Sequence, residues 1–364
     1  MLLPRRPPDG YIDPSLPPPD PNNDAQAPVI IYGYTPHLAL NILALILYGI
    51  FFFVYIYHLF ASFFRRVTSS STPARPTSRP FTILILIAII FEVVGYAFRL
   101  QSSPPPVGDP YNVINFVVQY FFIVVAPALI SAGIYTTITS LIRFLGERLG
   151  DRGDGEKETE RFTPLRRFGV KRRSIVVVFV ICDVIATIVQ VAGAALIGVS
   201  ESNGKSPDTG NNILLAGLAF QVFSFLLFII LYIIFIVQNL PPLSKPDLQP
   251  ARARVPGGLR TFVGVTLLAT LLVYLRTIFR LAETSQGVGG YASSHEVFFG
   301  VLEFAPVVVA VGLMGVWHPG RFVGRRKEVG GLETSGLGGP EREMSDGNGV
   351  QDAEVGKKKR FGVF

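Results

Sequence analysis

The stretch 274–303, YLRTIFRLAETSQGVGGYASSHEVFFGVLE, places three ionisable residues on an apolar helix and three more on the next, with a short glycine-rich loop between them. They are Arg276, Arg280 and Glu283 on the first helix, and His295, Glu296 and Glu303 on the second. Spacings of four and seven residues place the first three on one helical face, and Glu296 and Glu303 on one face of the second helix. A charge inside a membrane costs about 2.5–3.5 kcal/mol, so we expect both faces to point into the protein. This stretch is therefore the leading candidate for a functional site.

The composition of the whole chain favours a membrane-embedded helical bundle. Of its 364 residues, 49% are hydrophobic and only 16% are charged. Apolar runs of about 20 residues, the length of one span, lie at 37–60, 81–100, 113–142, 174–198, 212–237, 259–282 and 296–317. The sequence thus predicts an all-α polytopic protein with seven transmembrane helices. The third run is longer than a span needs, so it either tilts or continues beyond the bilayer.

Two polar tails flank the predicted membrane domain. Residues 1–28 are rich in Pro and Asp, so we expect a disordered extracytoplasmic tail and a first helix that acts as its own insertion signal. The membrane domain spans 29–323, and the mixed-charge, basic-ended segment 324–364 is expected to be a disordered cytoplasmic tail. Cys182 is the only cysteine, so no intramolecular disulfide forms.

Basic residues in the loops predict the orientation, because Lys and Arg beside a span resist translocation. They gather after the first, third, fifth and seventh runs: Arg65, Arg66, Arg75 and Arg79; ten residues from Arg143 to Arg173; Lys245, Arg252, Arg254 and Arg260; Arg321, Arg325, Arg326 and Lys327. The intervening loops hold only Lys205, apart from Arg99 at the end of a span. The N-terminus is therefore predicted outside and the C-terminus in the cytoplasm. The net charge of +7 then meets anionic lipid head groups, and no nucleic-acid partner is implied.

Polar residues inside the predicted spans fall into layers when depth is taken as about 1.5 Å per residue. Arg99, Arg280, Glu283, His295 and Glu296 lie near the outer ends, with Glu92, Arg276 and Glu303 deeper, and Asp183 and Gln221 near the midplane. Gln190 extends the Asp183 line outward, and Asn115 and Gln119 begin another line. Together they predict a polar cavity in the outer half of the bundle.

Each of these polar groups also has a structural interpretation. Arg276 with Glu303 or Glu92 is either a clamp between helices or part of a binding site. The outer charged residues either belong to the site or extend to interfacial water. Asp183 has no basic residue at matching depth, so it is protonated, hydrogen-bonded to Gln221, or available for a cation.

Small residues and prolines inside the spans have local interpretations. Gly133, Gly193 and Gly198 are predicted to allow close helix packing. Pro127 and Pro306 each free a backbone carbonyl and permit a kink.

Several membrane-protein chemistries are excluded by the sequence. No lysine lies in a predicted span, so a retinal Schiff base has nowhere to form. His37 and His295 lie at the outer ends and His58 and His318 at the inner ends, which argues against an intramembrane zinc hydrolase. No G-x-x-x-x-G-K-[ST] loop occurs, so the chain does not bind ATP in the P-loop manner. We expect no catalytic residues, metal or cofactor.

Eight short stretches, in order, resemble the fungal lipid-translocating exporter family, which includes aminocholesterol-resistance and sphingoid-base-resistance proteins and is termed RTA-like. They are YGYTPHLALNI (32–42), FEVVGYAFRL (91–100), APALISAGIY (126–135), CDVIATIVQVAGAAL (182–196), AGLAFQVFSF (216–225), LRTIFRLAETSQG (275–287), GYASSHEVFFGVLEFAP (290–306) and HPG (318–320). The family pattern implies functional roles for Glu92, Gly95, Arg99, Asp183, Gln190, Gln221, Arg276, Arg280, Glu283, His295 and Glu296. Glu303 departs from it, because the family more usually has Asp there.

The resemblance implies a protein that moves amphiphilic lipids, or confers tolerance to them, and some relatives are linked to porphyrin traffic. The alternative is a receptor or stress sensor that uses the loop 143–173 as a cytoplasmic partner surface. The candidate site has three arginines against five carboxylates, so two carboxylates lack a basic partner. Asp183 is the best candidate for one of them, which predicts a cationic amphiphile as the ligand. We expect the plasma membrane as the location.

Overall fold

The computed structural model describes residues 13–20, 23, 26–27, 30, 32–68, 79–149, 172–202, 206–239, 257–287 and 290–322. Within them, seven helices are long and apolar enough to cross a membrane. They are α1 (Leu38–Thr68), α2 (Arg79–Gln101), α3 (Val113–Leu149), α4 (Arg172–Ser202), α5 (Asp208–Asn239), α6 (Gly257–Ser285), and a seventh made of α7 (Glu296–Phe298), the π-helix η5 (Phe299–Phe304) and α8 (Ala305–Val316). The short α9 (Pro319–Phe322) follows. All seven predicted spans are confirmed, and the third run forms one helix that continues to Leu149.

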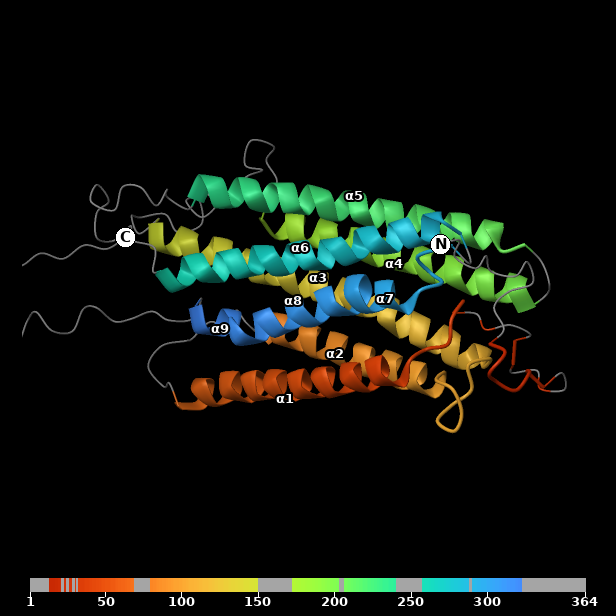
Figure 1. Cartoon of the computed structure of the whole chain (residues 1–364). Coiled ribbons are helices and arrows are strands. Elements are labelled where there is room, and N and C mark those ends of the chain that lie inside the picture. Colours follow the sequence, from red (N-terminus) through yellow and green to blue (C-terminus); the bar gives the residue numbers. More distant parts are fainter. Residues whose placement is uncertain are drawn as a thin grey trace, which may run out of the picture. The chain divides into compact units, whose positions relative to one another are not determined.

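The helices pack in chain order into a closed ring within the unit formed by residues 1–325. Each helix from α1 to α6 contacts the next, α6 contacts α8, and α8 returns to α1 (Figure 1). In addition, α3 touches α6 across the middle. We name the two ends of the bundle after the short helices that lie there, the α7 end and the α9 end.

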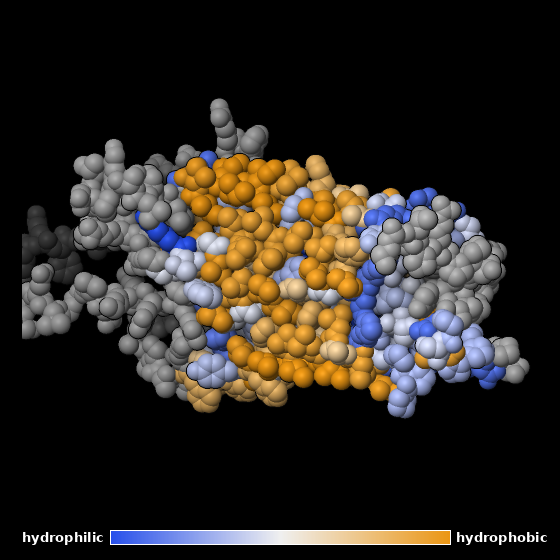
Figure 2. Space-filling model, viewed as in Figure 1, coloured by the Kyte–Doolittle hydropathy of each residue, from blue (hydrophilic) through white to orange (hydrophobic). Residues whose placement is uncertain are grey.

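The outer surface of the bundle is apolar. Large side chains such as Phe53, Val237 and Val297 are more than 70% exposed, and Figure 2 shows a hydrophobic band between polar ends. Water would penalise so large an apolar surface, whereas lipid does not. The chain is therefore an integral membrane protein.

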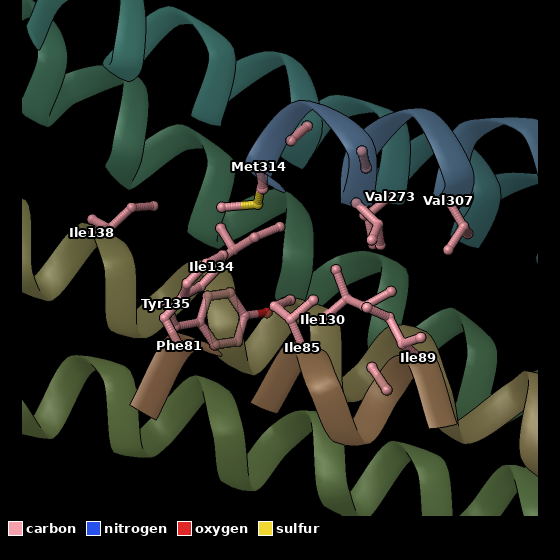
Figure 3. Close-up of a cluster of buried hydrophobic side chains, with 14 of the residues drawn as sticks. Phe81, Ile85, Ile89, Ile130, Ile134, Tyr135, Ile138, Val273, Val307 and Met314 are labelled. Carbon is pink, nitrogen blue, oxygen red and sulfur yellow. The ribbon is translucent and has the colours of Figure 1, made fainter. Parts of the chain in front are cut away.

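The inner faces of the helices form one continuous hydrophobic core. Figure 3 shows part of it, with residues of α2, α3, α6 and α8 packed together. Gly133 lies against Ile85, and Gly193 lies against the backbone of Leu214, so both are confirmed as close-packing positions. The same prediction for Gly198 is wrong, because no atom lies within 4 Å of the position a Cβ would take there.

Part of the N-terminal segment lies on the loop between α2 and α3. The Ala27 N–H donates to the Tyr111 carbonyl at 2.8 Å, and Gln26 Nε2 donates to Asp109 Oδ2 at 2.6 Å. The segment 324–364, residues 1–12 and most of the loop 143–173 lie outside the described residues, so the boundaries of the membrane domain and the proposed partner surface stay predictions.

Candidate functional site

A cluster of buried ion pairs joins α6 to η5, as the sequence predicts. Arg276 donates to Glu303 Oε1 through Nε at 3.0 Å and Nη2 at 2.6 Å. Arg280 Nε lies 3.0 Å from Glu303 Oε2, and its Nη1 lies 3.0 Å from Glu283 Oε2. Arg276 and Glu303 are both 2% exposed. The predicted pairing of Arg276 is confirmed, with Glu303 rather than Glu92 as its partner.

A proline in α3 supplies a further acceptor for this cluster. Pro127 has no N–H, so the carbonyl four residues earlier, on Ile123, lacks its helical donor. Arg276 Nη2 donates to that carbonyl at 3.1 Å. The proline thereby links α3 to α6, a role beyond the kink that the sequence suggests.

Glu303 lies in the π-helix η5, which is followed directly by Pro306 near the start of α8. A π turn holds one residue more than an α turn and is found mostly as a single turn within longer helices, often at functional sites. The sequence predicts only a possible kink at this proline. The extra residue changes which side chains of the seventh span share a face.

Arg99 lies in a second cluster at the α7 end. Its Nη2 donates to the Tyr34 hydroxyl at 2.7 Å and to Glu296 Oε1 at 3.3 Å. Its guanidinium lies 4.0 Å from the ring centre of Phe299 and 5.3 Å from that of Tyr32. The side chain is 1% exposed, so the interpretation that Arg99 extends to interfacial water is wrong.

Two of the aromatic residues around Arg99, Tyr32 and Tyr34, precede the first span. Burial raises the pKa of Tyr32 to about 12, so the phenol stays protonated and donates to Ser102 Oγ at 2.9 Å. The backbone N–H of His37 donates to both carboxylate oxygens of Glu296 at 3.0 Å. These contacts hold the residues that precede α1 against α2 and α7.

Asp183, near the middle of α4, is held differently. It is 3% exposed, and its Oδ2 accepts a hydrogen bond from Tyr135 of α3 at 2.8 Å. Oδ1 has no hydrogen-bond partner in the described part of the chain. Gln221 instead accepts from Gln190 at 2.8 Å, so of the three alternatives for Asp183 the hydrogen bond to Gln221 is wrong.

Aromatic rings surround the partner of Asp183. The ring centre of Tyr135 lies 4.2 Å from that of Phe228, 6.0 Å from Phe179 and 6.1 Å from Phe225. Phe179 lies one helical turn before Asp183 on α4. The carboxylate is thus placed beside a group of rings contributed by α3, α4 and α5.

Glu92 on α2 is the second carboxyl group without an ionic partner. It is 3% exposed, and the described residues give it neither a hydrogen bond nor an ion pair within 4 Å. It lies within electrostatic range of Arg276, Arg280 and Glu303. The prediction that two carboxylates remain unpaired is confirmed, because the three arginines of the site bind Glu283, Glu296 and Glu303.

Comparison with known proteins identifies the family. The sequence profile described as RTA1 like protein matches residues 84–150 and 161–326, more than half of the chain. The chain belongs to the RTA1-like family. This confirms the resemblance predicted from the eight stretches.

Named relatives of this RTA1-like protein come from Saccharomyces cerevisiae. The sphingoid long-chain base transporter RSB1 of strain Lalvin EC1118 is 25% identical over 324 residues, covering 82% of this chain and 75% of the relative. Protein RTA1 of strain S288c is 29% identical, covering 79% and 84%. Protoporphyrin uptake protein 1 of that strain is 32% identical, covering 61% and 63%. No solved structure matches.

Not every polar residue singled out from the sequence joins the two clusters. His295 is half-buried, and its Nδ1 lies 2.9 Å from the Tyr291 carbonyl. Asn115 Nδ2 donates to the Gln101 carbonyl at the start of α3. His58 and His318 lie at the α9 end of this RTA1-like protein, where their rings stack 4.2 Å apart. Sequence separation hides that pairing, because α1 and α8 become neighbours only when the ring closes.

Proposed function

We propose that this RTA1-like protein translocates cationic amphiphiles, such as sphingoid long-chain bases, across the membrane without hydrolysing ATP itself. The observation that carries the proposal is Asp183, a buried carboxylate for which the described residues supply neither a cation nor a hydrogen-bond partner for Oδ1. A buried carboxylate is costly unless it is paired or protonated. An ammonium ion of a ligand supplies the missing partner.

The rings beside Asp183 support an ammonium as the ligand group. Trp, Tyr and Phe faces attract ammonium ions by about 0.5–2 kcal/mol, most strongly where water is excluded. Tyr135, Phe179, Phe225 and Phe228 are all buried. A carboxylate beside buried aromatic faces suits a long-chain amine, whose alkyl chain then lies along apolar helix surfaces.

The charges of the site favour an amine over a porphyrin, despite the similarity to protoporphyrin uptake protein 1. A protoporphyrin carries carboxylates and needs unpaired cations. Arg99, Arg276 and Arg280 each already bind a carboxylate, whereas Asp183 and Glu92 bind no arginine among the described residues. The excess of acid therefore supports a cationic ligand.

The loop charges support an N-terminus outside, so that the α7 end is extracytoplasmic. The plasma membrane is the location that we propose. Single cysteines at Ser202 and at Lys157, in a Cys182→Ala background, test this orientation. We expect an impermeant thiol reagent to label the first position in intact cells and not the second. The reverse labelling would invert the topology.

Transport itself is tested with purified protein in lipid vesicles. The probe is a labelled long-chain quaternary ammonium compound, which cannot cross the bilayer by losing a proton. We expect the wild type to move it, and Asp183→Asn to reduce binding by at least about tenfold. Asp208→Asn, the same change at the exposed start of α5, serves as the control and should transport normally.

The same vesicles separate the proposed function from its alternative. A receptor or sensor binds the probe without moving it, so binding without flux by the wild type would favour that class. Asp183→Asn protein that transports at the wild-type rate would instead show that Asp183 is structural.

A further inference from the structure

Glu92 lies on a different helix from Asp183 and is buried, and no ionic partner for it occurs among the described residues. It lies on α2, whereas Asp183 lies on α4, and the described residues of α3 run between these helices. An ionised carboxyl in such a place would be expensive unless its charge is compensated. A proton is the simplest compensation.

A second unpartnered polar group faces the same region. The Tyr48 hydroxyl on α1 is 0% exposed and has no hydrogen-bond partner among the described residues. The Tyr48 phenol and the Tyr96 phenol of α2 both lie within electrostatic range of Glu92. Both rings pack on Phe304 of η5, with centres 6.1 and 5.6 Å from it.

The charged and titratable groups around Glu92 come from four elements. They are Tyr48 on α1, Tyr96 on α2 itself, Arg276 and Arg280 on α6, and Glu303 on η5. On α3, the ring of Tyr120 lies under Arg280 at 5.3 Å, and the Ile123 carbonyl binds Arg276.

The charges of the side chains around Glu92 balance only when Glu92 is neutral. Arg276 and Arg280 are matched by Glu303 and Glu283. Loss of a proton from Glu92 would add one uncompensated negative charge and give Arg276 a second carboxylate to bind. Glu92 is thus placed to couple its protonation to the contact that joins α6 to the π-helix η5.

We infer that Glu92 is a proton-binding site and that this protein exchanges protons for cationic amphiphiles, a coupling that rests on the proposed function. An O–H bond forms on the Glu92 carboxyl when a proton arrives from water on one side of the membrane. The bond breaks when the proton leaves to water on the other side, and the ammonium compound crosses in the opposite direction. One positive charge moves each way, so a one-to-one exchange carries no net charge.

The test uses the vesicles described above, with the membrane potential clamped at zero and a pH difference across the bilayer. For one-to-one exchange, the wild type should concentrate the quaternary ammonium probe about tenfold per pH unit. Because the probe carries no proton, a dye inside the vesicles should report proton movement opposite to it. Asp208→Asn should behave as the wild type does.

Glu92→Gln mimics the protonated carboxyl, so it separates coupling to protons from transport of the probe. We expect it to exchange labelled for unlabelled probe across the membrane, but to lose the accumulation driven by the pH difference. Glu92→Asp keeps a titratable group and should retain accumulation, which provides a test if Glu92→Gln folds poorly.

The two proposals fail in different ways. Wild-type protein that equilibrates the probe but ignores the pH difference overturns the proton site and leaves the transport function intact. Accumulation by Glu92→Gln at the wild-type level overturns the role of Glu92. Wild-type protein that moves no probe at all rejects transport, and proton exchange with it.

Discussion

The α6–η5 region and the α4–α5 region bury a carboxylate equally deeply but hold it in different ways. Glu303 is 2% exposed and lies between two arginines, with both of its oxygens in ion pairs. Asp183 is 3% exposed and receives one phenol hydrogen bond on one oxygen. Both oxygens of Glu303 therefore face a guanidinium, although Oε2 makes no hydrogen bond, whereas no Lys or Arg among the described residues pairs with Asp183.

The helices around these carboxylates are also joined differently. Charged side chains link α6 to η5, while α4 and α5 approach until Gly193 of one helix lies against the backbone of Leu214 of the other. Close backbone packing needs no charged partner. Burial alone therefore does not distinguish the two carboxylates, whereas the number of their arginine partners does.

Breaking the α6–η5 ion pair should have the largest effect on stability. Arg276→Met keeps much of the side-chain volume but leaves Glu303 with one arginine and removes the donor to the Ile123 carbonyl. Loss of one partner of a buried pair costs about 3–5 kcal/mol. The folded fraction in detergent, followed by size-exclusion chromatography during heating, measures this loss.

The double variant Arg276→Met with Glu303→Gln removes both charges and should retain more folded protein than Arg276→Met alone. Arg79→Met, at the other end of the bundle, controls for loss of an arginine whose one hydrogen bond to the described residues is long, at 3.4 Å. Strictly additive losses in the cycle would show that the pair contributes nothing as a pair.

Hydrophobic runs and helical spacing account for what the sequence predicts well. Each span stands out because lipid demands about 20 apolar residues in succession. Depth alone narrows the partner of Arg276 to Glu303 or Glu92, and the excess of two carboxylates follows from counting charges. These properties are local or additive, so the sequence carries them directly.

The partner of Asp183 and the π-helix could not be predicted in the same way. Tyr135 lies in an apolar run, where a tyrosine looks like core packing, and its hydroxyl becomes a donor only when α3 lies beside α4. Tyr34 is likewise remote in sequence from Arg99, which it binds. The π turn has no periodic signature, and only Pro306 marks its neighbourhood. Such contacts depend on packing between helices, which a single sequence leaves open.

Glycine positions on α4 test the close backbone contact between α4 and α5. The expected loss of stability is smaller than for the α6–η5 ion pair. A Cβ at Gly193 would lie 2.5 Å from the Leu214 nitrogen and 2.8 Å from its Cα, so α4 and α5 would have to separate. We expect Gly193→Ala to lower the free energy of unfolding by about 1–3 kcal/mol. Thermal unfolding of the purified protein checks this value.

Gly198 of the same helix is the matched control, because a Cβ there meets no atom within 4 Å. Gly198→Ala should be neutral or should stabilise the helix by up to about 1 kcal/mol. Equal losses at both glycines would contradict the close α4–α5 contact.

The smallest loss of stability is expected for Tyr135→Phe. It measures how strongly the Tyr135 hydroxyl binds Asp183. Tyr135→Phe keeps the ring and removes the donor to Oδ2. Hydrogen bonds between membrane helices average about 0.6 kcal/mol and rarely exceed about 1.7, so the loss should be near 1 kcal/mol.

Asp183→Asn in the Tyr135→Phe background completes a double-mutant cycle, read by thermal unfolding. We expect a coupling energy well below that of Arg276 with Glu303, because one phenol replaces two guanidinium groups. A coupling as large as that of the ion pair would mean that Tyr135 already satisfies Asp183, and the ammonium site would then lose the observation on which it rests.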